Sequence, residues 1–151
     1  MLECTQGCGR LIVTFAEHSA AANACRGELL GLMAIHLLLL SMHRISPALQ
    51  GSVKIYSDCL GALGRVADLP PNRIPTRCRH SDILKTILVN CSGLSFSCIY
   101  EHVKAHQDDD GKYDTLLCQS QLNCYCDGGA KSKLGQQVSS NTPPHQPYHW
   151  K

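Results

Sequence analysis

The 151-residue chain has little net charge, only +2 with neutral histidines. A basic surface over the whole protein is therefore excluded, and any contact with nucleic acid must come from a local patch. The chain also lacks a long uninterrupted apolar run: the longest, residues 29–42, contains His36 and is too short to cross a bilayer. We expect no membrane segment and no signal sequence, and the length fits one ordinary domain.

The ten cysteines suggest a disulfide scaffold by their number, but their spacing does not. They are scattered through the expected helices and strands, so we expect mostly reduced, buried thiols in an intracellular protein. A zinc site is the alternative, with thiolates from Cys4, Cys8, Cys124 and Cys126. No two cysteines have the C-x-x-C spacing that is typical of such a site.

β-Branched runs alternate with helical patterns along the chain. Strands are predicted at residues 11–16, 53–57 and 94–104, and helices at 24–43, 58–66, 81–89 and 122–134. This alternation predicts an α/β domain over residues 1–134 with parallel neighbouring strands. Residues 107–119 are expected to form a loop, and the polar residues 135–151 a disordered tail.

Three acidic residues border the apolar elements. Glu28 opens the apolar run of the first helix, Asp58 follows the strand that ends at Ser57, and Asp127 precedes a double glycine. A carboxylate beside an apolar core is costly to bury unless it is paired or binds a metal ion. The three therefore predict a shared site for a divalent cation. Each carboxylate would equally suit the N-terminus of a helix, which is the alternative interpretation.

A group of arginines flanks a proline-rich loop at residues 69–75. Arg73, Arg77 and Arg79 are candidates for binding phosphate groups of a nucleic acid. The alternative is that they form only a hydrated rim around the loop.

Four motifs occur in order along the chain: RGELLGL at residues 26–32, IYSD at 55–58, HVKAHQD at 102–108 and LNCYCDGGAK at 122–131. Together they resemble the ribonuclease H domain of retroelement reverse transcriptase polyproteins, over about residues 10–134. The resemblance implies a mixed sheet flanked by helices. It also implies that the chain acts on an RNA–DNA hybrid, as part of a longer reverse transcriptase polyprotein.

The resemblance also assigns roles to single residues. The family binds two Mg²⁺ or Mn²⁺ ions with four carboxylates, and the ions orient a water that attacks the RNA phosphodiester. Glu28, Asp58 and Asp127 match three of these ligands. His106 matches the histidine that assists water movement or product release, a role that suits an imidazole near neutral pH.

The chain departs from the family at its first catalytic aspartate, which belongs on a strand before residues 11–16. No aspartate precedes Asp58, and neither Glu3 nor Glu17 lies in the expected setting. We therefore expect the first strand to be missing and cleavage to be weak or absent. The alternative function is a non-catalytic ribonuclease H-like remnant that at most binds nucleic acid or a protein partner.

Overall fold

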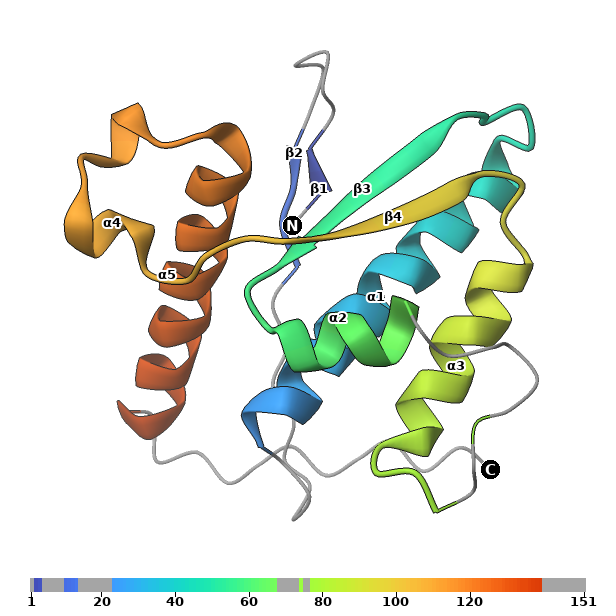
Figure 1. The fold of residues 1–151 in the computed structure, drawn as a ribbon, viewed down its shortest axis with the longest axis horizontal. Helices are drawn as coiled ribbons and strands as arrows, with labels where there is room; N and C mark the ends of the chain where they lie inside the picture. Colours follow the sequence, from blue (N-terminus) through green and yellow to red (C-terminus); the bar gives the residue numbers. More distant parts are fainter. Residues whose placement is uncertain (1, 4–9, 14–22, 68–73, 75–76, 140–151) are drawn as a thin grey trace.

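The computed structural model describes residues 2–3, 10–13, 23–67, 74 and 77–139. These residues form a mixed α/β structure in which a small two-stranded parallel sheet is flanked by helices (Figure 1). The predicted α/β class is confirmed at this level.

The parallel sheet consists of β3 (Ser52–Ser57) and β4 (Ser97–His102). The two strands pair residue by residue along their whole length, so their carboxyl ends lie at the same edge. β3 matches the predicted strand 53–57, and β4 is shorter than the predicted 94–104. In β3 the side chains of Ile55 and Ser57 are buried, because alternate residues of a strand point to the same face.

Three helices pack together on one face of this sheet: α1 (Ala24–Ile45), α2 (Leu60–Ala67) and α3 (Ser81–Ser92) (Figure 1). Their apolar faces form a core with β3 that contains Leu29, Leu32, Leu39, Ile55, Ala62, Leu63, Val66, Ile83, Leu84 and Ile87. The predicted helices 24–43 and 81–89 are confirmed, each with a few further residues at its end. Burial of these side chains supplies the main drive to fold.

The boundaries of α1 and α2 follow from local hydrogen bonds. The side chain of Asn23 accepts a hydrogen bond from the backbone N–H of Arg26 at 3.0 Å, which caps the first turn of α1. α2 begins two residues after Asp58, and the carbonyl of Cys59 accepts its first backbone bonds. The prediction that the helix starts at Asp58 is therefore wrong by two residues, and Asp58 lies in the connection between β3 and α2.

The chain after β4 forms α4 (Gln107–Asp110), the 3₁₀ turn η1 (Tyr113–Thr115) and α5 (Cys118–Ser139). Figure 1 shows α5 beside the carboxyl ends of the two parallel strands, and α5 contacts β3. This placement brings the residues of α5 close to Asp58.

Two predictions for this part of the chain are wrong. Residues 107–119 are not one loop, since they contain α4, η1 and the first residues of α5. The helix predicted at 122–134 extends through residue 139, so the first part of the predicted tail is helical. The remainder of that tail, residues 140–151, lies outside the described residues.

A short antiparallel hairpin precedes α1 and is separate from the parallel sheet. It consists of β1 (Leu2–Glu3) and β2 (Arg10–Leu11). Of the strand predicted at residues 11–16, residue 11 lies in β2, residues 12 and 13 are not in a strand, and the others lie outside the described residues. Within the described ranges, β3 pairs with β4 alone.

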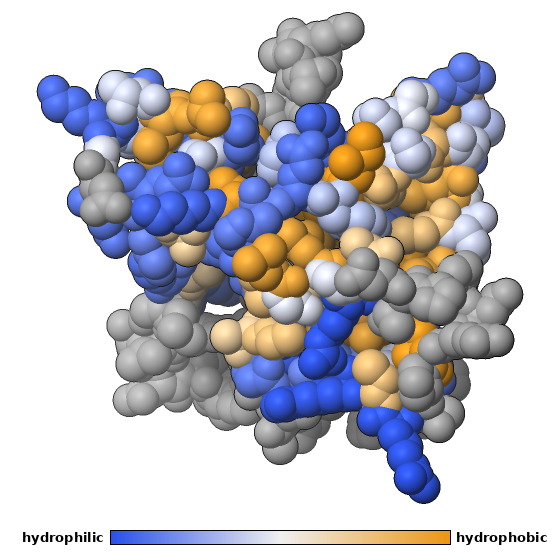
Figure 2. Space-filling model, viewed as in Figure 1, coloured by the Kyte–Doolittle hydropathy of each residue, from blue (hydrophilic) through white to orange (hydrophobic). Residues whose placement is uncertain are grey.

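Apolar side chains also reach the surface. Figure 2 shows apolar surface at several separate places on one face, with hydrophilic side chains between them. Helix α1 is long and apolar enough, by length and composition, to cross a membrane, a property that core helices of folded domains share. In this structure α1 packs against α2 and α3, and its buried residues belong to the core.

A buried hydrogen-bond chain crosses the core from α1 to α3. His36 is fully buried, and its Nδ1 lies 2.7 Å from the carbonyl oxygen of Leu32. Because a carbonyl only accepts, Nδ1 carries the hydrogen, and the neutral ring accepts at Nε2 from the hydroxyl of Tyr100 at 2.7 Å. The Tyr100 oxygen then accepts from the thiol of Cys91 at 3.6 Å.

This chain makes the stability of the fold sensitive to acid. Burial lowers the pKa of His36 below its ordinary value of 6.5, although the hydrogen bond to Leu32 opposes the shift. The unfolded chain therefore takes up the proton first, so stability contributed by neutral His36 is complete above pH 6.5 and falls as the pH drops toward the lowered folded-state pKa. We expect denaturant unfolding to show a lower free energy at pH 5.5 than at pH 7.5.

The double variant His36→Leu, Tyr100→Phe is the control for this pH dependence. It removes the titrating ring and its partner together, so the acid-induced loss should be smaller than in the natural chain. An identical loss in both proteins would show that other groups cause it.

Candidate functional site

Glu28 and Asp58 meet at the carboxyl end of β3. Ser57, the last residue of the strand, donates from its hydroxyl to Oε2 of Glu28 at 3.2 Å. The same hydroxyl accepts from the backbone N–H of Cys59 at 3.1 Å. Ser57 is buried, and it joins Glu28 of α1 to the backbone next to Asp58. Glu28 and Asp58 are both predicted site residues, and they are thirty positions apart in the sequence.

The charges at this edge act on Glu28. Burial raises the pKa of the Glu28 carboxyl above its ordinary value, and the negative charge of Asp58 raises it further. The hydrogen bond from Ser57 opposes this shift, and the charge of Asp127 adds to it. Asp58 and Asp127, the other two acidic residues predicted from the sequence, therefore both lie within electrostatic reach of Glu28. Mutual repulsion of this kind is typical of carboxylates gathered for function.

Asp58 is held by residues from two other elements. Its Oδ2 accepts a hydrogen bond from the side-chain amide of Asn123 on α5 at 3.2 Å. Its backbone carbonyl lies 3.2 Å from Nε2 of His102, the last residue of β4. The backbone N–H of Val103 also donates to the carbonyl of Ser57 at 3.1 Å, which extends the pairing of the strands to this point.

One face of α5 points at the same edge. Asn123, Asp127 and Lys131 are spaced four residues apart, which places them on one side of a helix. Asp127 forms an ion pair with Lys131 at 2.7 Å, and Nδ1 of His106 lies 3.9 Å from the same carboxylate oxygen. All four residues that the resemblance assigned, Glu28, Asp58, His106 and Asp127, thus lie around the carboxyl ends of the parallel strands.

His106 has an unusual backbone conformation. Its φ is +51°, in the left-handed region that few residues other than glycine adopt. It directly precedes α4, and its carbonyl accepts from the backbone N–H of Asp109 at 3.3 Å. Non-glycine residues in this conformation are concentrated at functional sites, because the surrounding structure must compensate for the strain.

The donor chemistry of this edge suits a hard cation, and its present arrangement is incomplete. Glu28 and Asp58 supply carboxylate oxygens, the ligands that Mg²⁺ and Mn²⁺ prefer. Within the described ranges, however, no three His, Cys, Asp or Glu side chains are close enough together to hold a metal ion. Asp127 is neutralised by Lys131. Glu28, Asp58 and Asp127 are the described residues at this edge whose carboxylates could hold such an ion.

The predicted arginine patch is described only in part. Arg73 lies outside the described residues, while Arg77 and Arg79 are exposed. The carbonyl of Arg79 accepts a hydrogen bond from the guanidinium of Arg65 at 3.1 Å. Two positive side chains are therefore available to solvent before α3, where a phosphate contact stays a prediction.

The predicted zinc ligands are likewise divided. Cys4 and Cys8 lie outside the described residues. Cys124 donates its thiol hydrogen to Asp108 at 3.3 Å, and burial is the main cause that raises the pKa of the Cys124 thiol. A raised pKa disfavours the thiolate that zinc requires, so the described part of the site offers no support for the zinc alternative.

Ser57, Asn123 and Lys131 were not singled out from the sequence. Asn123 and Lys131 stand four residues before and after Asp127, so helical spacing alone could have placed them beside it. Ser57 is adjacent to Asp58, but its contact with Glu28 depends on how α1 packs against the sheet. Local sequence carries no signal for that packing.

No protein-family model, curated protein or solved structure matches this chain.

Proposed function

We propose that this chain is a ribonuclease H-type domain of a retroelement that hydrolyses the RNA strand of an RNA–DNA hybrid in the presence of Mg²⁺ or Mn²⁺. The observation that carries the proposal is the meeting of Glu28 and Asp58 across Ser57, with Asp127 within electrostatic reach. The ordered sequence motifs support the same function. A site at the carboxyl ends of parallel strands is also where open α/β sheets usually bind their ligands.

The residues of the chain have distinct roles in this proposal. Divalent ions, when bound, activate a water and neutralise charge on the scissile phosphate. Glu28 and Asp58 would hold the ions, and Asn123 orients Asp58 through its amide. Lys131 pairs with Asp127 and would have to release it before that carboxylate could bind an ion. His106, next to Asp127 on an exposed turn, assists water movement or product release.

A second candidate is a non-catalytic remnant that binds an RNA–DNA hybrid or a protein partner. It is favoured by the lack, within the described residues, of three ligands close enough to hold a metal ion. Binding through Arg77 and Arg79 would weaken as salt increases, because phosphate contacts release counterions.

The deciding experiment is incubation of the purified chain with an end-labelled RNA–DNA hybrid and Mg²⁺ or Mn²⁺. Metal-dependent RNA fragments that chelation abolishes would support the nuclease. Intact RNA, with salt-sensitive retention of the hybrid by folded protein, would support the remnant. Duplex DNA of the same sequence is the substrate control, because discrimination of RNA requires contact with its 2′-hydroxyl groups.

A further inference from the structure

The position of α1 along the sheet is not determined by its apolar packing alone. The helix is apolar on most of its surface, and leucines of similar shape follow one another from Leu37 to Leu40. Apolar contacts are non-directional, so they define the position of such a helix less sharply than hydrogen bonds do. Directional contacts are needed to select one position.

The guanidinium of Arg26 donates two hydrogen bonds to Asp82, which tie the start of α1 to α3. Two further hydrogen bonds supply directional contacts between α1 and the sheet. Near the start of the helix, Glu28 accepts from Ser57 of β3. Eight residues later, about 12 Å along the axis, His36 accepts from Tyr100 of β4. The second bond is in the core, where a polar group that loses its partner is costly. Breaking it leaves Nε2 of the fully buried His36 without its partner, so this bond penalises a shift of α1.

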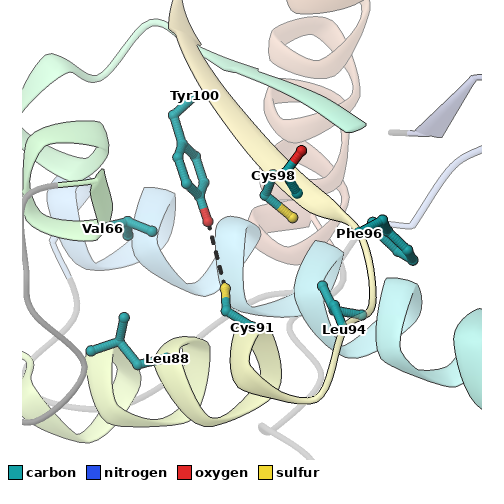
Figure 3. A pocket seen from close by; sticks show the side chains of 8 residues that line it. Val66, Leu88, Cys91, Leu94, Phe96, Cys98 and Tyr100 are labelled. Carbon is teal, nitrogen blue, oxygen red and sulfur yellow. Dashed lines mark hydrogen bonds between the residues drawn. The ribbon is translucent and has the colours of Figure 1, made fainter. Parts of the chain in front are cut away.

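Tyr100 is itself held in place by a contact with α3. Figure 3 shows its ring crossing from β4 toward α3, with its hydroxyl directed at the sulfur of Cys91. The ring lines a hollow of about 280 Å³ whose other walls include Leu88 and Phe96. It also stacks on the His36 ring, with ring centroids 5.8 Å apart. The hydroxyl that binds α1 is thus fixed by contacts to both β4 and α3.

We propose that Tyr100 is a positioning residue that, through His36, sets α1 at the position where Glu28 reaches Ser57 and Asp58. The site then depends on a hydroxyl two helical turns away from it, which contacts neither carboxylate. This inference rests on the proposed function for its biological meaning. The positioning itself concerns the metal-free protein and can be tested there.

The first variant is Tyr100→Phe, which keeps the ring and removes the hydroxyl. The measurement is the nuclear Overhauser effect between the side chains of Glu28 and Ser57 in the folded, metal-free protein. We expect its intensity to fall at least about twofold, because α1 then samples other positions. Tyr56→Phe is the matched control: it removes a hydroxyl that bonds Glu101 on the other face of the sheet, and should leave the effect unchanged.

The second variant separates positioning from stability. His36→Leu combined with Tyr100→Phe replaces both partners by apolar groups, so the fold should recover most of the stability lost in the single variant. The contact between Glu28 and Ser57 should nevertheless remain weakened. The inference is wrong if the double variant regains both its stability and the natural intensity of this contact. It is also wrong if the contact is unchanged in Tyr100→Phe, because apolar packing alone then positions Glu28.

Mg²⁺ titration followed by amide chemical shifts distinguishes this inference from the proposed function. If the natural chain binds no Mg²⁺ at the carboxyl end of β3, the metal-dependent function is contradicted. The positioning role of Tyr100 is then still tested by the contact between Glu28 and Ser57 in the metal-free protein. If the natural chain binds Mg²⁺, the Tyr100→Phe variant should bind it about threefold to tenfold more weakly, since misplacement of one ligand weakens a metal site. Equal affinity in both proteins would overturn the role of Tyr100.

Discussion

Asp58→Asn is expected to reduce metal-dependent cleavage of an RNA–DNA hybrid about 100-fold or more, with little change in stability. The substitution keeps the shape of the side chain and removes the negative charge that a hard cation requires. The amide oxygen can still accept from Asn123, so the contact with α5 is preserved. The measurement is the initial rate of RNA cleavage with Mg²⁺, compared with the free energy of unfolding in urea.

Stability should even rise slightly in this variant, because the charge that raises the pKa of Glu28 is removed. Loss of activity together with equal or higher stability is typical of residues that serve function rather than folding. Asp109→Asn is the matched control, since Asp109 is an exposed carboxylate on α4 near the same edge. Cleavage that survives Asp58→Asn at the natural rate would exclude Asp58 as a ligand.

The two candidate functions give different results in this comparison. For a nuclease, the natural chain and Asp109→Asn cleave, while Asp58→Asn does not. For a remnant, all three leave the RNA intact and retain the hybrid to the same extent, because retention depends on positive side chains rather than on Asp58. Hybrid retention by each protein should therefore be measured at the same salt concentrations as cleavage.

The sequence predicts the central elements of this fold well, because their signals are local and strong. The apolar run after Asn23 and the β-branched run before Asp58 became α1 and β3 nearly as expected. The end of the chain was harder to predict. Residues 107–119 are polar and lack periodicity, yet they contain α4 and η1, and α5 continues through Gly128 and Gly129. Helix propensity is a weak guide here, because the cost of two glycines is small compared with the sum over a 22-residue helix.

The gathering of three acidic residues at one edge was predictable from the sequence, but the contacts that each of them makes were not. The sequence motifs single out Glu28, Asp58 and Asp127, and the structure places them around the carboxyl ends of the parallel strands. The contact of Asp127 with Lys131, however, neutralises one of the three carboxylates. The bond from Ser57 to Glu28 arises from the packing of α1 on the sheet. Both depend on relative positions in space, for which neighbouring residues in sequence carry no signal.

Leu29→Ala should destabilise the protein by about 3 kcal/mol, the usual cost of losing a buried leucine and leaving a cavity. Leu29 is 0% exposed and packs in the core formed by α1, β3, α2 and α3. The same substitution at Leu37, which lies on α1 with 43% exposure, should cost less than about 1 kcal/mol. Both variants change helix propensity equally, so the difference between their urea unfolding free energies measures burial alone.

This pair of leucines also decides how α1 is used. In the folded domain, the buried face of α1 carries Leu29 and the partly exposed face carries Leu37, so the two costs must differ. A helix of this length and composition that crossed a bilayer would instead present apolar residues to lipid around its circumference. Equal costs at the two positions would contradict the core role of α1, and with it the meeting of Glu28 and Asp58. A large difference would support both, because the packing of Leu29 in the core and the bond from Ser57 to Glu28 occur together in the folded domain.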